Sequence, residues 1–193
     1  PIVKGWYRAG FRSDSVISGV WTQLGGKYDL ELKKGAKPVE PKRPQEPKPP
    51  YPYREEEVTF MNTAENFSLA GTLTLPQGEG PFPAVVLISG SGQQDRNETV
   101  FMHKPFLVLA DHLTRNGIAV LRYDDRGIGK SKGNAAKATS MSFADDAEAA
   151  VAYLMQHPEI NSGKIGLAGH SEGGLIAPIV ASRNRNIAFI VSL

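Results

Sequence analysis

From residue 55 onward the chain alternates short apolar runs with longer segments in which apolar residues recur every three or four positions. The run 84–88 is apolar throughout, as in a strand buried on both faces of a sheet. The segment 105–116 has helical periodicity and stops before Gly117, a residue type that often follows a helix end. Strands that alternate with helices predict an α/β fold, a mostly parallel sheet with helices on both faces. The predicted strands are 57–62, 67–75, 84–88, 118–123, 165–168 and 187–193, and the predicted helices are 105–116, 143–156 and 172–182.

Two of the predicted helices carry local signals in their sequence. Ser142 and Asp145 are placed as a capping pair for the helix 143–156. Pro178 lies within the helix 172–182, where a proline removes one backbone hydrogen bond and bends the helix. We therefore expect a kink or a weakened turn at Pro178.

Residues 1–34 have a β pattern of their own. The runs 16–22 and 28–33 flank Gly25 and Gly26, and the second run alternates apolar with charged residues, as a half-buried strand does. Glycines permit the positive φ of a tight hairpin turn. Because a lone hairpin is marginally stable in water, we predict that residues 1–34 are the C-terminal part of a small β domain.

The segment 35–54 is predicted to be a proline-rich linker. Prolines recur there at every third position, which would align their rings along one face of a polyproline II helix. Such a segment serves as a semi-rigid spacer or as the ligand of a proline-recognition domain. We expect the spacer, because the segment joins two regions with structured patterns. The prolines concerned are Pro38, Pro41, Pro44, Pro47 and Pro50.

Charge divides the chain near the same place. Residues 1–54 carry 11 Lys and Arg against 5 Asp and Glu, whereas residues 55–193 carry 11 against 15. The basic part lacks interleaved aromatic residues or a basic helix, so no nucleic-acid partner is expected. No apolar stretch reaches the roughly 18 residues that predict a membrane span. The chain has no cysteine and its four histidines lack ligand-like spacing, so we expect no metal site.

The pentapeptide Gly169-His170-Ser171-Glu172-Gly173 fits the pattern Gly-x-Ser-x-Gly. It follows a predicted strand and opens a predicted helix, which is the context in which this motif forms a nucleophile elbow. A sharp turn there lifts the serine hydroxyl clear of the sheet, and its glycines avoid clashes with neighbouring strands. We predict that Ser171 is a catalytic nucleophile. The alternative is a turn of small residues with an incidental serine.

Acyl transfer by such a nucleophile also needs two N–H donors for the oxyanion of the tetrahedral intermediate. The first donor is predicted to be the backbone N–H of Glu172, the residue after the nucleophile. The second should come from the glycine-rich loop 89–96 that follows the strand 84–88. Within that loop we expect the backbone N–H of Ser91, with Gly92 as the alternative. A flexible loop without this role is the other interpretation.

The segment 124–131 invites a different interpretation, because Gly129-Lys130-Ser131 resembles the end of a phosphate-binding P-loop. The first glycine of that motif would fall on Asp124, and no helix follows at once. We therefore expect no nucleotide site. The segment is predicted to be structural, with Arg126 paired to a nearby aspartate.

Taken together, these motifs resemble the α/β-hydrolase superfamily, and within it the EstD-type bacterial carboxylesterases. The resemblance spans residues 55–193 and implies hydrolysis of a small-molecule carboxylic ester through an acyl-enzyme on Ser171. Similar bacterial proteins often carry a small β-rich domain in front, which would suit residues 1–34. The matching segments are Gly90-Ser91-Gly92 with Asp95-Arg96, Arg122 to Ser131, and Gly169 to Gly174.

In this superfamily the triad acid and histidine follow the nucleophile, but residues 172–193 contain neither Asp nor His. We therefore expect a C-terminally truncated chain with little esterase activity alone, because a serine without a base is a poor nucleophile. Ending on the apolar strand 187–193 leaves an edge through which the chain could self-associate. The alternatives are a serine peptidase of the same fold, or a non-catalytic interaction module that uses the proline-rich segment.

The first residue is Pro1, and no apolar signal core follows it. We expect that a leader has been removed. Together with the β-rich front region, this leans towards export and otherwise leaves the compartment open.

Overall fold

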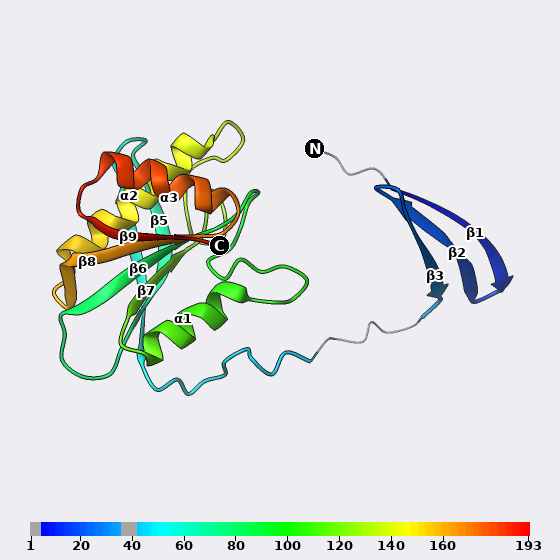
Figure 1. Cartoon of the computed structure of the whole chain (residues 1–193), viewed down its shortest axis with the longest axis horizontal. Helices are drawn as coiled ribbons and strands as arrows, with labels where there is room; N and C mark the ends of the chain where they lie inside the picture. Colours follow the sequence, from blue (N-terminus) through cyan, green and yellow to red (C-terminus); the bar gives the residue numbers. More distant parts are fainter. Residues whose placement is uncertain (1–4, 36–41) are drawn as a thin grey trace. The chain divides into compact units, whose positions relative to one another are not determined.

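A computed structural model describes residues 5–35 and 42–193, which form twelve helices and strands in two units (Figure 1). The first unit ends at Lys42, and the second runs from Arg43 to Leu193. Pro38 and Pro41 of the predicted linker lie outside the described residues. Within the described residues, no helix is long and apolar enough to cross a membrane.

The first unit is an antiparallel sheet of three strands in the order β1-β2-β3. Its strands are β1 (Gly5–Ser13), β2 (Val16–Gln23) and β3 (Gly26–Lys33). The sequence pattern missed β1, because glycines and arginines interrupt its alternation. The turn between β2 and β3 is made by Leu24 and Gly25, both with positive φ, and not by the two glycines. That these strands belong to a larger β domain stays a prediction.

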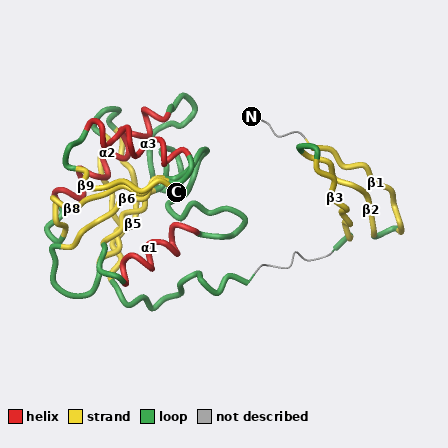
Figure 2. The backbone as a smooth tube through the Cα atoms, in the orientation of Figure 1, coloured by secondary structure: helices red, strands yellow, loops and turns green. Residues whose placement is uncertain are grey.

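The second unit contains a sheet of six strands in the order β4-β5-β7-β6-β8-β9. Figure 2 draws its strands in yellow and its helices in red. The first two strands run antiparallel to their neighbours and the other four are parallel to one another. Its strands are β4 (Arg54–Asn62), β5 (Phe67–Leu75), β6 (Phe82–Ile88), β7 (Ala119–Tyr123), β8 (Ile160–Gly169) and β9 (Ile187–Ser192). Every strand predicted in this region is therefore present, some of them with longer bounds.

Three helices cover the two faces of this sheet: α1 (Pro105–Arg115), α2 (Ser140–Gln156) and α3 (Glu172–Arg183). Helices α2 and α3 lie on one face and α1 on the other, as Figure 1 shows. Residues of β6 alternate between the two cores, with Val86 and Ile88 towards α2 and α3, and Val85 and Leu87 towards α1. The continuous apolar run of this strand is thus explained by burial on both faces.

Of the predictions made for the helix ends and for Pro178, some are confirmed and some are wrong. The predicted capping pair is wrong, because α2 begins earlier, at Ser140, with Thr139 as its N-cap residue. Ser142 and Asp145 therefore lie inside the helix, where Asp145 accepts a hydrogen bond from Arg183. Helix α3 continues through Pro178 without a break. Gly117 adopts a φ of 85° just beyond α1, as expected of a residue that ends a helix.

The second half of the proline-rich segment packs on the second unit, which thus begins before the predicted residue 55. A turn is closed by the N–H of Glu46 and the carbonyl of Arg43. The guanidinium of Arg43 donates to the carbonyl of Phe101 at 2.9 Å, and Lys104 pairs with Glu46 at 3.2 Å. These contacts hold Arg43 and Glu46 against the segment that precedes α1.

Strand β9 is the edge of the sheet within the described part of the chain. Phe189, Ile190 and Val191 on it are between 42 and 44 % exposed. Such an apolar edge favours pairing with another strand. Self-association through β9 stays a prediction.

Candidate active site

Ser171 lies between the end of β8 and the start of α3, in the sharp turn that joins them. Its φ of 53° and ψ of −112° fall in a region that residues with a side chain rarely adopt. The turn is fixed by hydrogen bonds from the N–H of His170 to the carbonyl of Ile88, and from the N–H of Gly173 to the carbonyl of His170. The surrounding sheet therefore holds Ser171 in a strained conformation.

Two glycines of the motif are required by close packing. A Cβ on Gly169 would lie 2.0 Å from the carbonyl oxygen of Gly173. A Cβ on Gly173 would lie 2.2 Å from the carbonyl oxygen of Ile88, on the neighbouring strand β6. Both distances are far below contact between non-bonded atoms. The predicted clash with a neighbouring strand is confirmed at Gly173, whereas at Gly169 the clash is with the start of α3.

The glycine-rich loop after β6 lies beside Ser171. A Cβ on Gly90 would be 3.2 Å from the Cβ of Ser171, so no side chain fits between the loop and the serine at this point. The N–H of Gly90 donates to a carboxylate oxygen of Glu98 at 2.7 Å. Ser91 is exposed in the same loop, and its carbonyl accepts a hydrogen bond from the side chain of Gln94. The loop therefore reaches the serine through Gly90, directly before the predicted donor Ser91.

Two aspartates after β7 hold this loop in place. Asp125 accepts hydrogen bonds from the hydroxyl of Ser89 at 2.8 Å and from the N–H of Gln94 at 2.9 Å. Asp124 binds the side chain of Arg96 through both carboxylate oxygens, at 3.0 and 2.8 Å. Burial raises the pKa of Asp124, but the hydrogen bonds from Arg96 outweigh it and lower that pKa below its ordinary value. No local sequence pattern indicates these contacts, since they join residues 28 to 36 positions apart.

Asp125 is expected to make folding depend on pH. Its burial raises its pKa to about 6 from an ordinary 3.8, against the hydrogen bonds from Gln94 and Ser89. The folded state favours protonated Asp125. The stabilisation of the folded state by this proton is therefore complete below pH 3.8 and is lost as the pH rises through 6. Such a shift corresponds to about 3 kcal/mol.

The check is urea unfolding of the full-length protein and its Asp125→Asn variant at pH 4.5 and pH 7.5. Comparing variant with wild type at each pH removes the background from other groups. From pH 4.5 to pH 7.5, the unfolding free energy of the variant minus that of wild type should increase by about 2 kcal/mol. An equal difference at both pH values would contradict the assignment.

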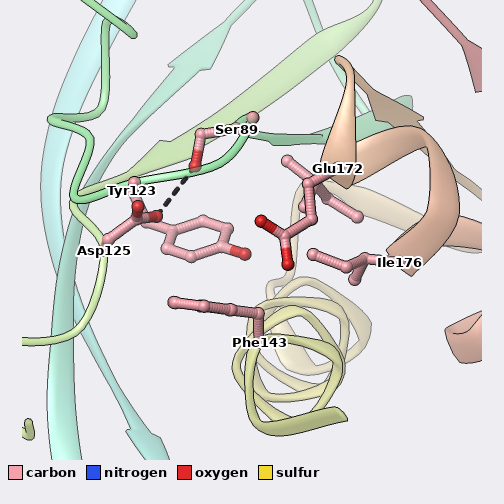
Figure 3. A pocket seen from close by; sticks show the side chains of 9 residues that line it. Ser89, Tyr123, Asp125, Phe143, Glu172 and Ile176 are labelled. Atoms are coloured by element: carbon pink, nitrogen blue, oxygen red, sulfur yellow. Dashed lines mark hydrogen bonds between the residues drawn. The ribbon is translucent and has the colours of Figure 1, made fainter. Parts of the chain in front are cut away.

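A small pocket opens next to the turn (Figure 3). The carboxylate of Glu172 points into it, towards the ring of Tyr123, and accepts a hydrogen bond from the hydroxyl of Ser140 at 2.7 Å. The sequence assigned a role only to the backbone N–H of Glu172 and missed this placement of its side chain. The pocket is lined by Ile88, Ser89, Gly90, Gly92, Tyr123, Asp125, Phe143, Glu172 and Ile176.

The segment after β7 is structural, as the sequence indicated. Arg126 is 1 % exposed and binds Asp146 through two nitrogens, at 2.8 and 3.0 Å, which confirms its pairing with an aspartate. The hydroxyl of Ser131 donates to the carbonyl of Asp124 at 2.6 Å, and Lys130 binds Glu57. Among the residues that the structure describes, no group of three or more His, Asp or Glu side chains is placed to hold a metal ion.

Comparison with known proteins agrees with this architecture. A family model described as serine aminopeptidase, S33, matches residues 103–192. Esterase EstD of Thermotoga maritima is 33 % identical over 136 residues, which are 70 % of this chain and 31 % of that protein. Human acyl-coenzyme A thioesterase 1 is 31 % identical over 123 residues, 63 % of this chain and 25 % of that enzyme. The chain thus spans about a third or less of these relatives.

Solved structures show the same fold. A hypothetical protein of Pseudomonas aeruginosa superposes with a TM-score of 0.63 at 25 % identity, over 73 % of this chain and 42 % of that one. An esterase of Pyrococcus furiosus superposes with a TM-score of 0.57 at 25 % identity, over 72 % of this chain and 51 % of that one. The fold and these similarities together show that the chain has the α/β-hydrolase fold and that it resembles EstD-type esterases.

Proposed function

We propose that this chain supplies the nucleophile and the oxyanion-binding N–H groups of a serine hydrolase that acts on carboxylic esters. The observation that carries the proposal is the position of Ser171. It lies in a strained turn between a core strand and a helix, with the loop residue Gly90 alongside. This arrangement is the one that α/β-hydrolases use for an activated serine.

The proposed reaction proceeds through an acyl-enzyme. The hydroxyl oxygen of Ser171 attacks the ester carbonyl carbon, and the serine proton passes to a base and then to the leaving alcohol. The C–O bond to that alcohol breaks as the acyl group remains on the serine. Water, activated by the same base, then releases the carboxylic acid and restores the serine. The reaction requires no metal or organic cofactor.

Two backbone N–H groups are proposed to bind the oxyanion. Glu172 is the first residue of α3, and the first N–H groups of a helix have no partner within the helix. The N–H of Gly90 is already bound to Glu98, so the second donor falls to the next residue, Ser91, with Gly92 as the alternative. Such preorganised donors commonly provide the largest single contribution to acyl-transfer catalysis.

The base and the acid of the triad are proposed to lie beyond Leu193 in the protein that carries this chain. Residues 1–193 alone are therefore expected to turn over p-nitrophenyl acetate at no more than the background rate. Turnover by this segment that disappears on Ser171→Ala would overturn that expectation.

A second candidate function is hydrolysis of aminoacyl amides, which the match to the serine aminopeptidase family favours. Thioesters are a further acyl donor to test, because human acyl-coenzyme A thioesterase 1 is among the relatives. A non-catalytic interaction module that uses the proline-rich segment is the remaining alternative. Hydrolysis of esters, amides and thioesters would each proceed through an acyl-enzyme on the same serine. The proposal therefore depends on the nucleophile, and the leaving group distinguishes the three activities.

The test is labelling of the full-length protein with a fluorophosphonate probe, followed by peptide mapping. An active serine hydrolase should carry the probe on Ser171. The same preparation, assayed with a short-chain p-nitrophenyl ester, an acyl-coenzyme A and an aminoacyl amide, should hydrolyse the ester fastest. No labelling of Ser171 would favour the interaction module, and faster cleavage of the amide would favour the peptidase.

A further inference from the structure

Glu98 connects the glycine-rich loop to the turn that carries Ser171. Its side chain is 7 % exposed, and one carboxylate oxygen makes both of its contacts. That oxygen accepts the N–H of Gly90 at 2.7 Å and lies 2.7 Å from Nδ1 of His170. The neighbours of these two partners are the proposed donor Ser91 and the nucleophile Ser171. A single buried carboxylate thus joins the two segments that must cooperate in catalysis.

The chain is built to present Glu98 at this point. Glu98 adopts a φ of 51°, an uncommon conformation that is held by a hydrogen bond from its N–H to the carbonyl of Asp95. The side chain of Asp95 caps the same turn by accepting the N–H groups of Asn97 and Thr99. The turn is anchored further by the two-oxygen contact between Arg96 and Asp124. The turn that carries Glu98 is therefore held by its own hydrogen bonds, independently of the contact between Glu98 and Gly90.

The contact also constrains its histidine partner. An ionised carboxylate accepts hydrogen bonds only, so Nδ1–H of His170 is the donor whenever Glu98 is ionised. His170 precedes Ser171 directly, and its backbone is tied to β6 through the carbonyl of Ile88. The backbone hydrogen bonds hold the turn independently of Glu98, so the element that depends on Glu98 is the loop at Gly90.

We propose that Glu98 is a positioning residue, which fixes the spacing between the oxyanion loop at Gly90 and the elbow at Ser171. The inference rests on the proposed function. Glu98 does not reach the reacting atoms, and it acts through the backbone of Gly90. Loss of its contacts leaves the part-buried N–H of Gly90 without its acceptor, so the loop moves to find another partner. The donor that follows Gly90 then no longer meets the oxyanion.

The experiment compares two variants of the full-length protein, Glu98→Gln and Glu98→Met. The Gln variant keeps an oxygen that can accept from Gly90, whereas the Met variant keeps the bulk without an acceptor. We expect Glu98→Met to lower kcat for a short-chain ester about 10- to 100-fold, less than the 10²- to 10³-fold loss from removing an oxyanion donor itself. The Gln variant should recover most of that loss, and KM should change little in both.

Glu56→Ala is the matched control, because Glu56 on β4 forms another glutamate–histidine contact, with His157 at the end of α2 at 3.4 Å. It is expected to retain kcat. His170→Ala should cost less kcat than Glu98→Met, since it keeps the contact between Glu98 and Gly90. If Glu98→Met does not fold, Glu98→Asp, whose shorter side chain withdraws the oxygen, takes its place with a similar expected loss.

If the kcat of Glu98→Met equals that of wild type, the inference is overturned. The same holds for Glu98→Asp where that variant replaces Glu98→Met. A loss carried by KM alone, or a Gln variant no better than Met, would overturn it too. Failure of the proposed function has a different signature, because the wild-type protein would then hydrolyse no ester, or a Ser171→Ala variant would keep the wild-type rate. An inactive Ser171→Ala protein with an unaffected Glu98→Met protein rejects only the positioning role.

Discussion

Replacing Ser171 by alanine in the full-length protein is expected to lower kcat for a short-chain ester by about 10⁴- to 10⁶-fold, the range that loss of a triad residue costs in serine hydrolases. The substitution removes the attacking oxygen and keeps the Cβ, so the turn and its hydrogen bonds are retained. The residual rate should still exceed hydrolysis in water, because the N–H donors and substrate binding remain. Steady-state kinetics with p-nitrophenyl esters measure the loss, and fluorophosphonate labelling should disappear with it.

The strained backbone at Ser171 provides a control for this experiment. Glycine accepts a positive φ without cost, so Ser171→Gly should relieve strain and raise the unfolding free energy by about 1 kcal/mol over Ser171→Ala. Both variants should be inactive. A Ser171→Ala protein that keeps more than about a tenth of its activity would assign the chemistry to another residue, since a triad member costs far more than that.

The second large effect is expected on stability, at Arg126. This side chain is buried and binds Asp146 with two nitrogens, and its guanidinium also lies over the rings of Phe67 and Phe143, 5.0 and 5.7 Å from their centroids. Arg126→Ala would leave the carboxylate of Asp146, itself fully buried, without its cation. Removing one partner of a buried pair costs about 3–5 kcal/mol. Urea unfolding of the full-length variant at pH 7.5 measures this loss.

A comparison of variants isolates the buried charge as the cause. Arg183 pairs with Asp145 at 2.9 Å on the surface, and Arg183→Ala should cost about 1 kcal/mol or less. The double variant Arg126→Met with Asp146→Leu should lose less than Arg126→Ala, because no unpaired charge remains. Equal losses for Arg126→Ala and Arg183→Ala would show that the buried pair contributes no more than a surface pair.

Much of the fold was predictable because its signals are local. The apolar run of β6 and the glycine after α1 each report on the residues around them, and both were interpreted correctly. The motif around Ser171 was found in the same way, since a strand, a turn and a helix are consecutive in sequence. The start of α2 was missed because the capping signal at Ser142 had a competing position only three residues earlier, at Thr139.

The sequence by itself determined the α/β architecture and the position of the candidate nucleophile, because periodicity and turn chemistry are properties of neighbouring residues. Only the tertiary structure decided what surrounds that serine. Glu98 reaches His170 across 72 positions and Asp125 reaches Ser89 across 36. No local pattern reports such contacts, because the sheet brings the ends of β6, β7 and β8 together only once it has formed. The contacts that hold the loop against the turn therefore depend on the order of the strands in the sheet.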